Sequence, residues 1–166
     1  EYGHNDFGEN KVQEAMDKWV EIKKKIKDLN LHMIGKLQTN KVKQAVKIFD
    51  YIHSVDSIKL AKKISDEQKK IEKNIKIFIQ INIGEENQKS GVNLSDFEKL
   101  YDYCKNELKL DVIGLMCIPP NNDNPEKYFS QMFEIKKKFN LKDLSMGMSS
   151  DYLLAMKYGS TYVRIG

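Results

Sequence analysis

Two adjacent serines near the C-terminus stand where an anion would bind. Ser149 and Ser150 follow the apolar run Leu144–Met146 and precede Asp151–Tyr158, whose pattern predicts a short helix. A helix N-terminus carries unsatisfied backbone N–H groups and the positive end of the helix dipole, which together suit a phosphate. The alternative is an ordinary helix cap, which serines supply in most proteins. The motif alone does not decide between the two.

A buried positive charge is expected at the end of the sequence. The strand-like run Tyr162–Ile165 contains Arg164. A guanidinium that points into a fold is costly unless it faces a ligand or a carboxylate. We therefore expect Arg164 either to contact a bound ligand or to form a salt bridge inside the fold, and we favour the ligand.

The other reactive side chains fit structural roles. Exposed lysines with a pKa of about 10.4 are poor nucleophiles at neutral pH, so Lys36 and Lys41 are assigned to the surface or to a helix start. We expect His53, at the end of a strand, to be a hydrogen-bonded structural imidazole, because a general base needs a partner that the sequence does not reveal. Cys104 and Cys117 are far apart without a Cys-x-x-Cys motif, which predicts two buried, reduced thiols and no metal site.

The sequence predicts that strands and helices alternate along the chain and position these residues. Period-3.6 patterns predict helices, and short β-rich runs predict strands. The expected helices are Lys11–Asp28, Asn40–Lys47, Ser57–Lys70, Leu94–Asn106, Pro125–Phe139 and Asp151–Tyr158, and the expected strands are Asn5–Gly8, Leu31–Ile34, Tyr51–Ser54, Ile75–Ile83, Val112–Ile118, Leu144–Met146 and Tyr162–Ile165. Strands separated by helices run parallel, which leaves an open doubly wound sheet or a closed barrel. In either fold the loops after the strands form the site.

Composition fits one domain without a nucleic-acid or membrane surface. The 166 residues are 40% hydrophobic, enough for one sizeable core. The 28 Lys and Arg residues exceed the 24 Asp and Glu residues by 4. The basic runs at 21–27 and 135–139 alternate with core residues at helical spacing, which indicates solvated helix faces and not nucleic-acid binding. No apolar stretch approaches a membrane span, so a cytoplasmic protein is expected.

Several short motifs occur in a fixed order along the chain. They are Phe7-Gly-Glu-Asn10, Ile34-Gly-Lys-Leu-Gln-Thr-Asn-Lys41, His53-Ser-Val-Asp56, Lys89-Ser-Gly91, Gly114-Leu-Met116 and the Met148-Ser149 pair. With them the chain resembles the pyridoxal phosphate homeostasis proteins, single-domain relatives of the barrel domain of alanine racemase. The resemblance spans the whole chain. It implies an α/β fold of the (β/α)8 TIM-barrel type, with residues 1–166 in one barrel domain that is incomplete at both ends. The first βα unit and the extreme C-terminus of the family are expected to be missing, as in part of a longer polypeptide.

The resemblance also implies the cofactor pyridoxal 5′-phosphate and the residues that bind it. These are Asn10, Met148, Ser149, Ser150, Arg164 and Gly166. Asn10 is expected to contact the cofactor, with a helix cap as its alternative. Met148, both serines and Gly166 are expected to donate to the phosphate, and Arg164 to face the pyridine nitrogen and keep it unprotonated.

The remaining positions implied by the resemblance lie around the pocket or in the core. Lys89 is expected at the pocket border and Met116 inside the barrel as packing. The lysine that forms the Schiff base is expected upstream of Glu1, so no residue of this chain is assigned a catalytic or metal-binding role.

The function implied by the resemblance is storage and delivery of pyridoxal 5′-phosphate without an established turnover. Its partners would be the cofactor and enzymes that need it. The alternative is an amino-acid racemase, which requires two opposed proton carriers. Tyr152 and Tyr162 are the candidate tyrosines, and packing explains them better. A barrel lacking one strand exposes two sheet edges, which predicts either a dimer that covers the gap or marginal stability. The expected state is a monomer or a weak dimer.

Overall fold

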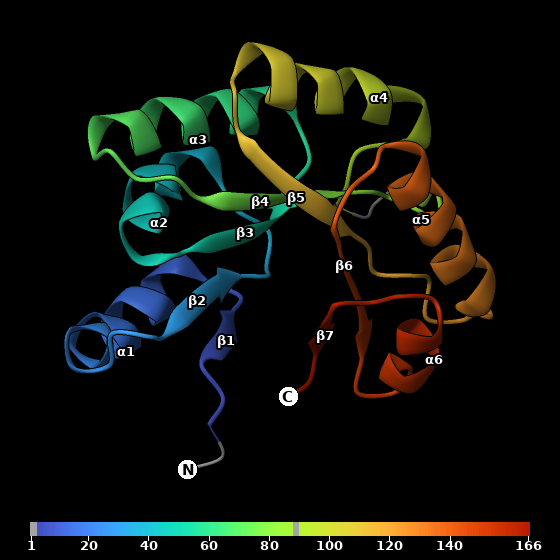
Figure 1. Cartoon of the computed structure of the whole chain (residues 1–166), viewed down its shortest axis with the longest axis horizontal. Coiled ribbons are helices and arrows are strands. Elements are labelled where there is room, and N and C mark those ends of the chain that lie inside the picture. The colour runs from blue at the N-terminus through green and yellow to red at the C-terminus, as the bar shows by residue number, and fades with distance from the viewer. Residues whose placement is uncertain (1–2, 88–89) are drawn as a thin grey trace.

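A computed structural model describes residues 3–87 and 90–166. Strands and helices alternate along the described chain (Figure 1). The strands are β1 Asp6–Glu9, β2 Asn30–Met33, β3 Tyr51–Val55, β4 Lys76–Gln80, β5 Asp111–Met116, β6 Asp143–Met148 and β7 Tyr162–Arg164. The helices are α1 Val12–Lys25, α2 Val42–Ile48, α3 Ile58–Lys70, α4 Leu94–Asp102, α5 Glu126–Lys138 and α6 Tyr152–Lys157, with a short 3₁₀ turn, Thr39–Lys41, before α2. Each predicted strand and helix is therefore present.

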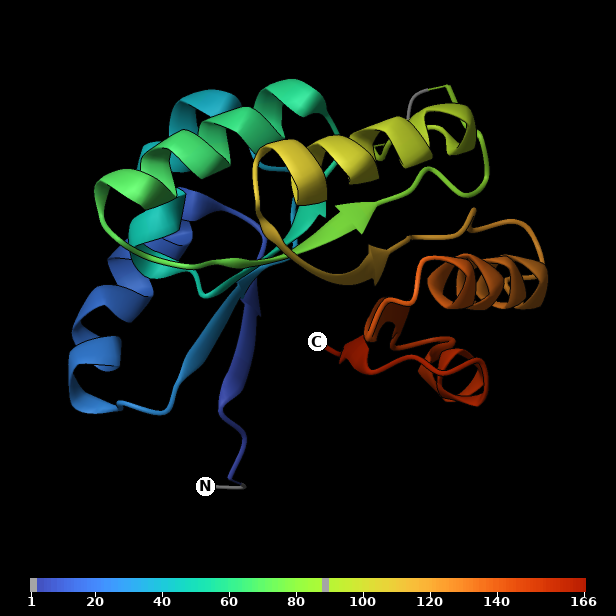
Figure 2. The same ribbon diagram turned by 45° about the horizontal axis from the view of Figure 1, so that its top comes forward.

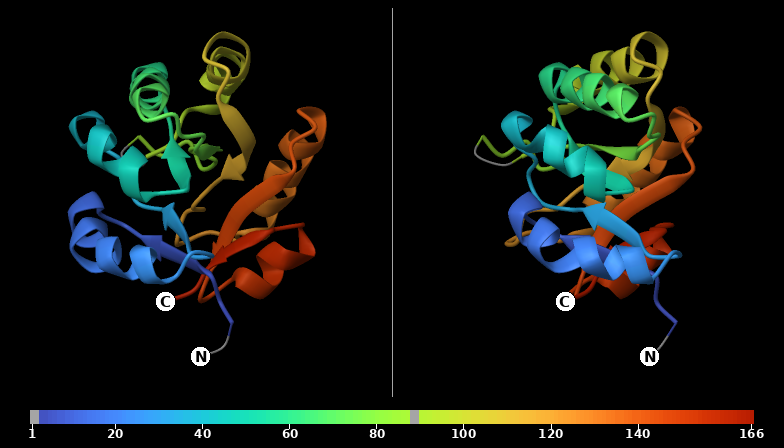
Figure 3. Two further views of the ribbon diagram at one scale, coloured as in Figure 1. Left: turned by 60° about the vertical axis from the view of Figure 1, so that its left-hand side comes forward. Right: turned by 90° about the vertical axis from the view of Figure 1, so that its left-hand side faces the viewer.

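The strands form one parallel sheet in the order β1 to β7, so each strand pairs with its neighbours in sequence. A doubly wound sheet would reverse its strand order at a switch point, and this sheet does not. The helices lie on the outer side of a sheet that curls round towards closure (Figures 2 and 3). The structure thus confirms the barrel and excludes the open sheet that periodicity left possible. Strands β1 and β7 are the two edges.

Two hydrophobic clusters stabilise the barrel, one on each face of the sheet. The larger lies between the strands and the helices and includes Ile52 and Ile77. The smaller lies inside the barrel and is built on Tyr51, Phe78 and Met116. Ile52 follows Tyr51 and Ile77 precedes Phe78, so the two clusters alternate along each strand as the period of 2 requires. Met116 is fully buried in the inner cluster, which confirms its predicted packing role.

Two predicted elements differ in extent from the observed ones. The helix predicted over 94–106 ends as α4 at Asp102 and continues as a π-helical segment, Tyr103–Glu107. The strand predicted to reach Ile83 ends at Gln80. The reason is local hydrogen bonding, because the Asn82 side chain donates to the Glu86 carbonyl and accepts from the Glu86 N–H. These bonds close a turn where the apolar pattern suggested more strand.

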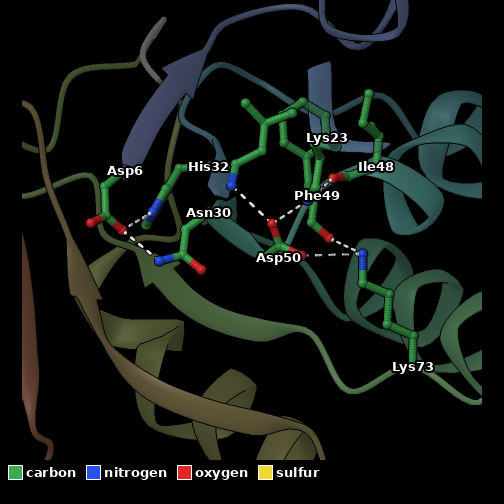
Figure 4. A network of polar contacts seen from close by, with 9 residues as sticks. Asp6, Lys23, Asn30, His32, Ile48, Phe49, Asp50 and Lys73 are labelled. Carbon is green, nitrogen blue, oxygen red and sulfur yellow. Dashed lines mark hydrogen bonds and ion pairs between the residues drawn. The ribbon is translucent and has the colours of Figure 1, made fainter. Parts of the chain in front are cut away.

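A partly buried ion cluster joins the elements at the amino ends of the strands (Figure 4). Asp50 pairs with Lys23 of α1, and its second oxygen lies 3.6 Å from Lys73 Nζ. The Asp50 carboxylate also accepts the Leu31 N–H at 2.9 Å. Lys73 donates to the Phe49 carbonyl at 2.6 Å. One carboxylate therefore ties α1 and β2 to the segment between α3 and β4.

The structure confirms the predicted state of the cysteines. Cys104 and Cys117 are buried and free, and burial raises the pKa of each thiol to about 12. Within residues 3–87 and 90–166, no three His, Cys, Asp or Glu side chains are grouped to hold a metal ion. None of the described helices has the length and hydrophobicity that a membrane span requires.

Candidate functional site

A cavity of about 410 Å³ opens at the carboxyl ends of β1, β2, β6 and β7 and reaches into the barrel. Its volume lies within the range of roughly 300 to 1,000 Å³ that is typical of small-molecule sites. It is lined by Asp6, Phe7, Gly8, Asn10, His32, Ile34, His53, Ile118, Met148, Ser149, Tyr162, Val163, Arg164, Ile165 and Gly166. Residues of both edge strands face each other across it.

Five of the six residues predicted to bind a ligand line this cavity: Asn10, Met148, Ser149, Arg164 and Gly166. Ser150 is exposed beside Ser149 and is not among the lining residues. Lys89, predicted at the pocket border, lies outside the described residues. Topology explains the convergence, since parallel strands bring residues from opposite ends of the sequence to one rim.

The position of Asn10 distinguishes its two possible roles. Helix α1 begins after Lys11, and no side chain caps it. The Asn10 side chain has no hydrogen-bond partner in the part of the chain that the structure describes, which leaves its amide free for a ligand. Its backbone is fixed by Gly35, where a Cβ would lie 2.2 Å from the Asn10 carbonyl oxygen. Any side chain at Gly35 would therefore displace Asn10.

The turn after β6 offers fewer backbone donors than the sequence suggested. The Met148 N–H donates to the Asp151 carboxylate at 2.7 Å, so it is not available to a ligand. The N–H groups of Ser149 and Ser150 have no acceptor among the described residues. The Ser149 hydroxyl lies 3.4 Å from the Gly166 carbonyl, a long contact that links the turn to the end of β7.

Arg164 is held from behind by two neutral oxygen atoms. Its Nη1 donates to Ser145 Oγ at 2.8 Å and its Nη2 to the Cys117 carbonyl at 2.9 Å. No carboxylate among the described residues pairs with it, so the salt bridge considered as the alternative to a ligand contact is not formed. Burial lowers the pKa of the Arg164 guanidinium, but arginine remains charged in proteins. Its other three N–H groups are left for the cavity that it lines.

A hydrogen-bonded chain of polar side chains runs from Arg164 across the barrel, and three of its members, Asp6, His32 and His53, also line the cavity. Ser145 Oγ lies 2.8 Å from His53 Nδ1, and His53 Nε2 lies 2.9 Å from His32 Nδ1. His32 Nε2 lies 3.0 Å from the Asp6 carboxylate, which also accepts from Asn30 (Figure 4). His53 is therefore the hydrogen-bonded imidazole that we expected. Asp6, His32 and Ser145 were not predicted as site residues, although a polar residue inside an apolar strand is a signal for such a network.

His32 and His53 are both buried and stacked on aromatic rings. Burial is the main cause that lowers the pKa of His32, and it lowers the pKa of His53 well below the usual value. The His32 ring stacks on Tyr51 and the His53 ring on Phe78, with centroids 4.2 and 4.1 Å apart. Low dielectric surroundings disfavour the imidazolium form. We therefore assign both rings as neutral near pH 7.

The lowered pKa values predict an acid-sensitive fold. Below pH 6.5, the usual pKa of histidine, the two imidazoles bind protons in the unfolded protein but stay neutral in the folded protein. Acid therefore favours unfolding. The free energy of unfolding is expected to fall by up to roughly 1.4 kcal/mol per pH unit for each histidine. Urea titrations at pH 7 and 5.5 measure this slope.

Two variants attribute the slope to the buried pair. His53→Gln is expected to reduce it, and His4→Ala, which removes an exposed histidine, is expected to retain it. An unchanged slope in His53→Gln would show that the buried pair does not cause it.

The two predicted surface lysines border a different hollow. Lys36 and Lys41 lie with Asn10 around a space of about 440 Å³ beside the start of α1. Lys36 is exposed and Lys41 lies in the 3₁₀ turn, in agreement with their predicted surface and helix-start roles. No described lysine lines the cavity that contains Arg164.

Comparison with known proteins agrees with this architecture. The family model described as alanine racemase, N-terminal domain, matches residues 1–166. The pyridoxal phosphate homeostasis protein of Aquifex aeolicus is 39% identical, over 96% of this chain and 73% of that protein. The protein of the same name from Escherichia coli K12 is 34% identical, over 99% of this chain and 74% of that protein.

Solved structures give the same result. PipY of Synechococcus elongatus, in a structure with pyridoxal phosphate (PLP) bound, is 34% identical with a TM-score of 0.88, and the match covers 99% of this chain and 80% of that chain. Alanine racemase of Corynebacterium glutamicum, at 17% identity and a TM-score of 0.69, shares the fold. The chain therefore belongs to the alanine racemase N-terminal domain family and, within it, to the pyridoxal phosphate homeostasis proteins.

Proposed function

We propose that this chain binds pyridoxal 5′-phosphate in the cavity at the strand ends and takes part in its storage and delivery. The observation that carries the proposal is the position of Arg164, a buried and fixed cation on the wall of a cavity that has no described carboxylate paired with it. A cation in such a place needs an electron-rich partner. The names of the relatives, and the PLP in the PipY structure, support this choice of ligand.

The residues around the cavity suit the polar groups of this cofactor. The free N–H groups of Ser149 and Ser150, the serine hydroxyls and the Gly166 N–H are donors for a phosphate. Arg164 has donors only, so the pyridine nitrogen opposite it would have to accept and stay unprotonated. The Asn10 amide is free for a ring substituent. When bound, the cofactor supplies an aldehyde and an electron-accepting ring, and an unprotonated ring nitrogen weakens that ring as an electron sink.

The same cavity favours binding over racemisation. Racemisation needs proton carriers on both faces of the substrate. Tyr162 lines the cavity, but burial and then a hydrogen bond to Tyr51 raise the pKa of its phenol, so the phenol stays protonated at neutral pH and cannot accept a proton. We accordingly propose a carrier role without turnover, with apoenzymes as recipients and a monomer or weak dimer as the working state.

We further propose that residues 1–166 belong to one barrel domain. One sheet includes all seven described strands, and one large cluster covers its outer face. A second domain would need a core of its own.

Replacing Ser149 and Ser150 together by alanine tests the assigned phosphate donors. The double variant is expected to bind pyridoxine 5′-phosphate roughly tenfold to hundredfold more weakly. One hydrogen bond to a charged group is worth about 1.5 to 3 kcal/mol, only Ser149 of the two serines lines the cavity, and the backbone donors remain. Isothermal titration calorimetry measures the affinity. Pyridoxine 5′-phosphate is the probe because it has no aldehyde to react with the many surface lysines.

Ser95→Ala is the matched control, since Ser95 is exposed on α4 and does not line the cavity. Its affinity is expected to equal that of the unmodified chain. Equal affinity in the double variant would remove the serine hydroxyls from the proposed site.

A further inference from the structure

The hydrogen-bonded chain behind Arg164 has only one consistent direction when both imidazoles are neutral. The Asp6 carboxylate accepts only, so His32 must carry its proton on Nε2 and donate it to Asp6. His32 Nδ1 is then an acceptor, and His53 must donate to it from Nε2. His53 Nδ1 is in turn an acceptor for the Ser145 hydroxyl. The Ser145 oxygen is left to accept from Arg164.

The hydrogen-bonded chain has a cation, Arg164, at its donor end and an anion, Asp6, at its acceptor end. Every hydrogen of the chain points from Arg164 on β7 towards Asp6 on β1, so the chain links the two edges of the sheet through the barrel interior. Asp6 Oδ1 also accepts from Asn30, and the Cys117 carbonyl accepts from Arg164. Each member therefore has a partner of the right kind, which is the condition under which a buried polar network favours one arrangement.

We propose that Ser145, His53 and His32 are positioning residues that hold Arg164 in one orientation and so present its remaining N–H groups to the cavity. The proposal rests on the proposed function in one respect, namely that the atom opposite Arg164 belongs to the pyridine ring of the cofactor. Ser145 is fully buried and does not line the cavity. It therefore acts through Arg164 and not on the ligand.

The composition of the sequence indicates that position 164 requires a guanidinium group and not simply a positive charge. Arg164 is the only arginine among 28 Lys and Arg residues, so lysine stands at each of the other 27 basic positions. A lysine ammonium is a single nitrogen and cannot bond backwards to Ser145 Oγ and the Cys117 carbonyl while facing forward with further donors. A guanidinium is a planar fork with five N–H groups and can do both.

Contacts between aromatic rings hold the two histidines of the hydrogen-bonded chain in place. Tyr162, two residues before Arg164 on β7, packs against both imidazoles, with ring centroids 5.6 Å from His32 and 5.8 Å from His53. Together with the stacking partners of the two histidines, this encloses them on several sides. The imidazoles consequently have little room to rotate or to exchange partners.

Nuclear magnetic resonance on the ligand-free protein tests the direction of the chain. With one arginine and three histidines in the sequence, the side-chain nitrogen signals are few enough to assign singly. Long-range ¹H–¹⁵N spectra at pH 7 are expected to show His32 and His53 as neutral rings protonated at Nε2. The Arg164 guanidinium is expected to give separate, slowly exchanging N–H signals. A proton on His53 Nδ1 would overturn the proposed direction.

Variants at Ser145 test the positioning role. Ser145→Ala is expected to merge or broaden the Arg164 N–H signals and to weaken pyridoxine 5′-phosphate binding about tenfold. Binding of inorganic phosphate, which does not need the ring contact, is expected to stay unchanged. Ser145→Thr keeps the hydroxyl and is expected to restore the Arg164 signals and the affinity.

The outcomes separate this proposal from the proposed function. Unchanged Arg164 signals in Ser145→Ala would overturn the positioning role whether or not a ligand binds. Unchanged affinity in that variant, with binding in the unmodified chain, would also overturn it. Absence of pyridoxine 5′-phosphate binding in the unmodified chain, with the predicted tautomers and Arg164 signals present, would refute the proposed function and leave the positioning of Arg164 supported.

Discussion

Replacing Arg164 with Gln is expected to weaken pyridoxine 5′-phosphate binding by roughly tenfold to hundredfold, because a charge-assisted hydrogen bond of about 1.5 to 3 kcal/mol is lost. Arg164 lines the cavity, and its two protein partners, Ser145 and the Cys117 carbonyl, bind it on the far side. Glutamine keeps donors but loses the charge and the fork. Calorimetry measures the affinity, and thermal unfolding shows whether the variant is folded.

Arg164→Lys separates charge from geometry. Lysine preserves the charge, so an affinity equal to that of the unmodified chain would mean that charge alone matters. We expect instead that Arg164→Lys binds nearly as weakly as Arg164→Gln. A single lysine nitrogen cannot donate to Ser145 and the Cys117 carbonyl and also to a ligand in the cavity. If both variants bind with unchanged affinity, Arg164 is not part of the site.

Replacing Asp50 with Ala is expected to lower the free energy of unfolding by roughly 2 to 4 kcal/mol. The change removes the carboxylate shared by Lys23 and Lys73 and leaves the Leu31 N–H without its acceptor. The estimate is below that for a fully buried pair because Asp50 and Lys73 side chains are 28% and 26% exposed. Urea unfolding measures the change.

Two further variants identify the cause of that loss. Asp50→Asn keeps an oxygen for the Leu31 N–H, so it is expected to lose less stability than Asp50→Ala. Asp102→Ala, at an exposed position of α4, is expected to change stability by less than about 0.5 kcal/mol. Equal stability in Asp50→Ala and the unmodified chain would show that the cluster is only a surface ion pair.

Most of the fold was predictable because the barrel repeats one simple unit. The period-2 and period-3.6 patterns predicted the seven strands and the six α-helices of the described chain. The alternation of strands with helices was compatible with two folds, an open doubly wound sheet and a closed barrel. The choice between them depended on strand order, which local periodicity does not encode. Element ends were less accurate where side chains decided them, as in the turn that Asn82 closes after β4.

The site was predictable only as far as it lies at strand ends. Asn10, Ser149 and Gly166 follow strands, and parallel topology brings such positions together. The hydrogen-bonded network that begins at Arg164 was not predictable, because Ser145, His53 and His32 are far apart in sequence and lie within strands. Hydrogen bonds of the backbone were not predictable either. The bond from the Met148 N–H to the Asp151 carboxylate could not be inferred from residue types.

A titration of the ¹⁵N-labelled chain with pyridoxine 5′-phosphate would show whether the cofactor binds in this cavity, since it reports where the ligand binds without a reactive aldehyde. We expect the signals of Asn10, Ser149 and Gly166 and of the Arg164 side chain to shift together, with one dissociation constant. Shifts confined to the hollow around Lys36 and Lys41, or no shifts at all, would contradict the assignment of the cofactor to this cavity.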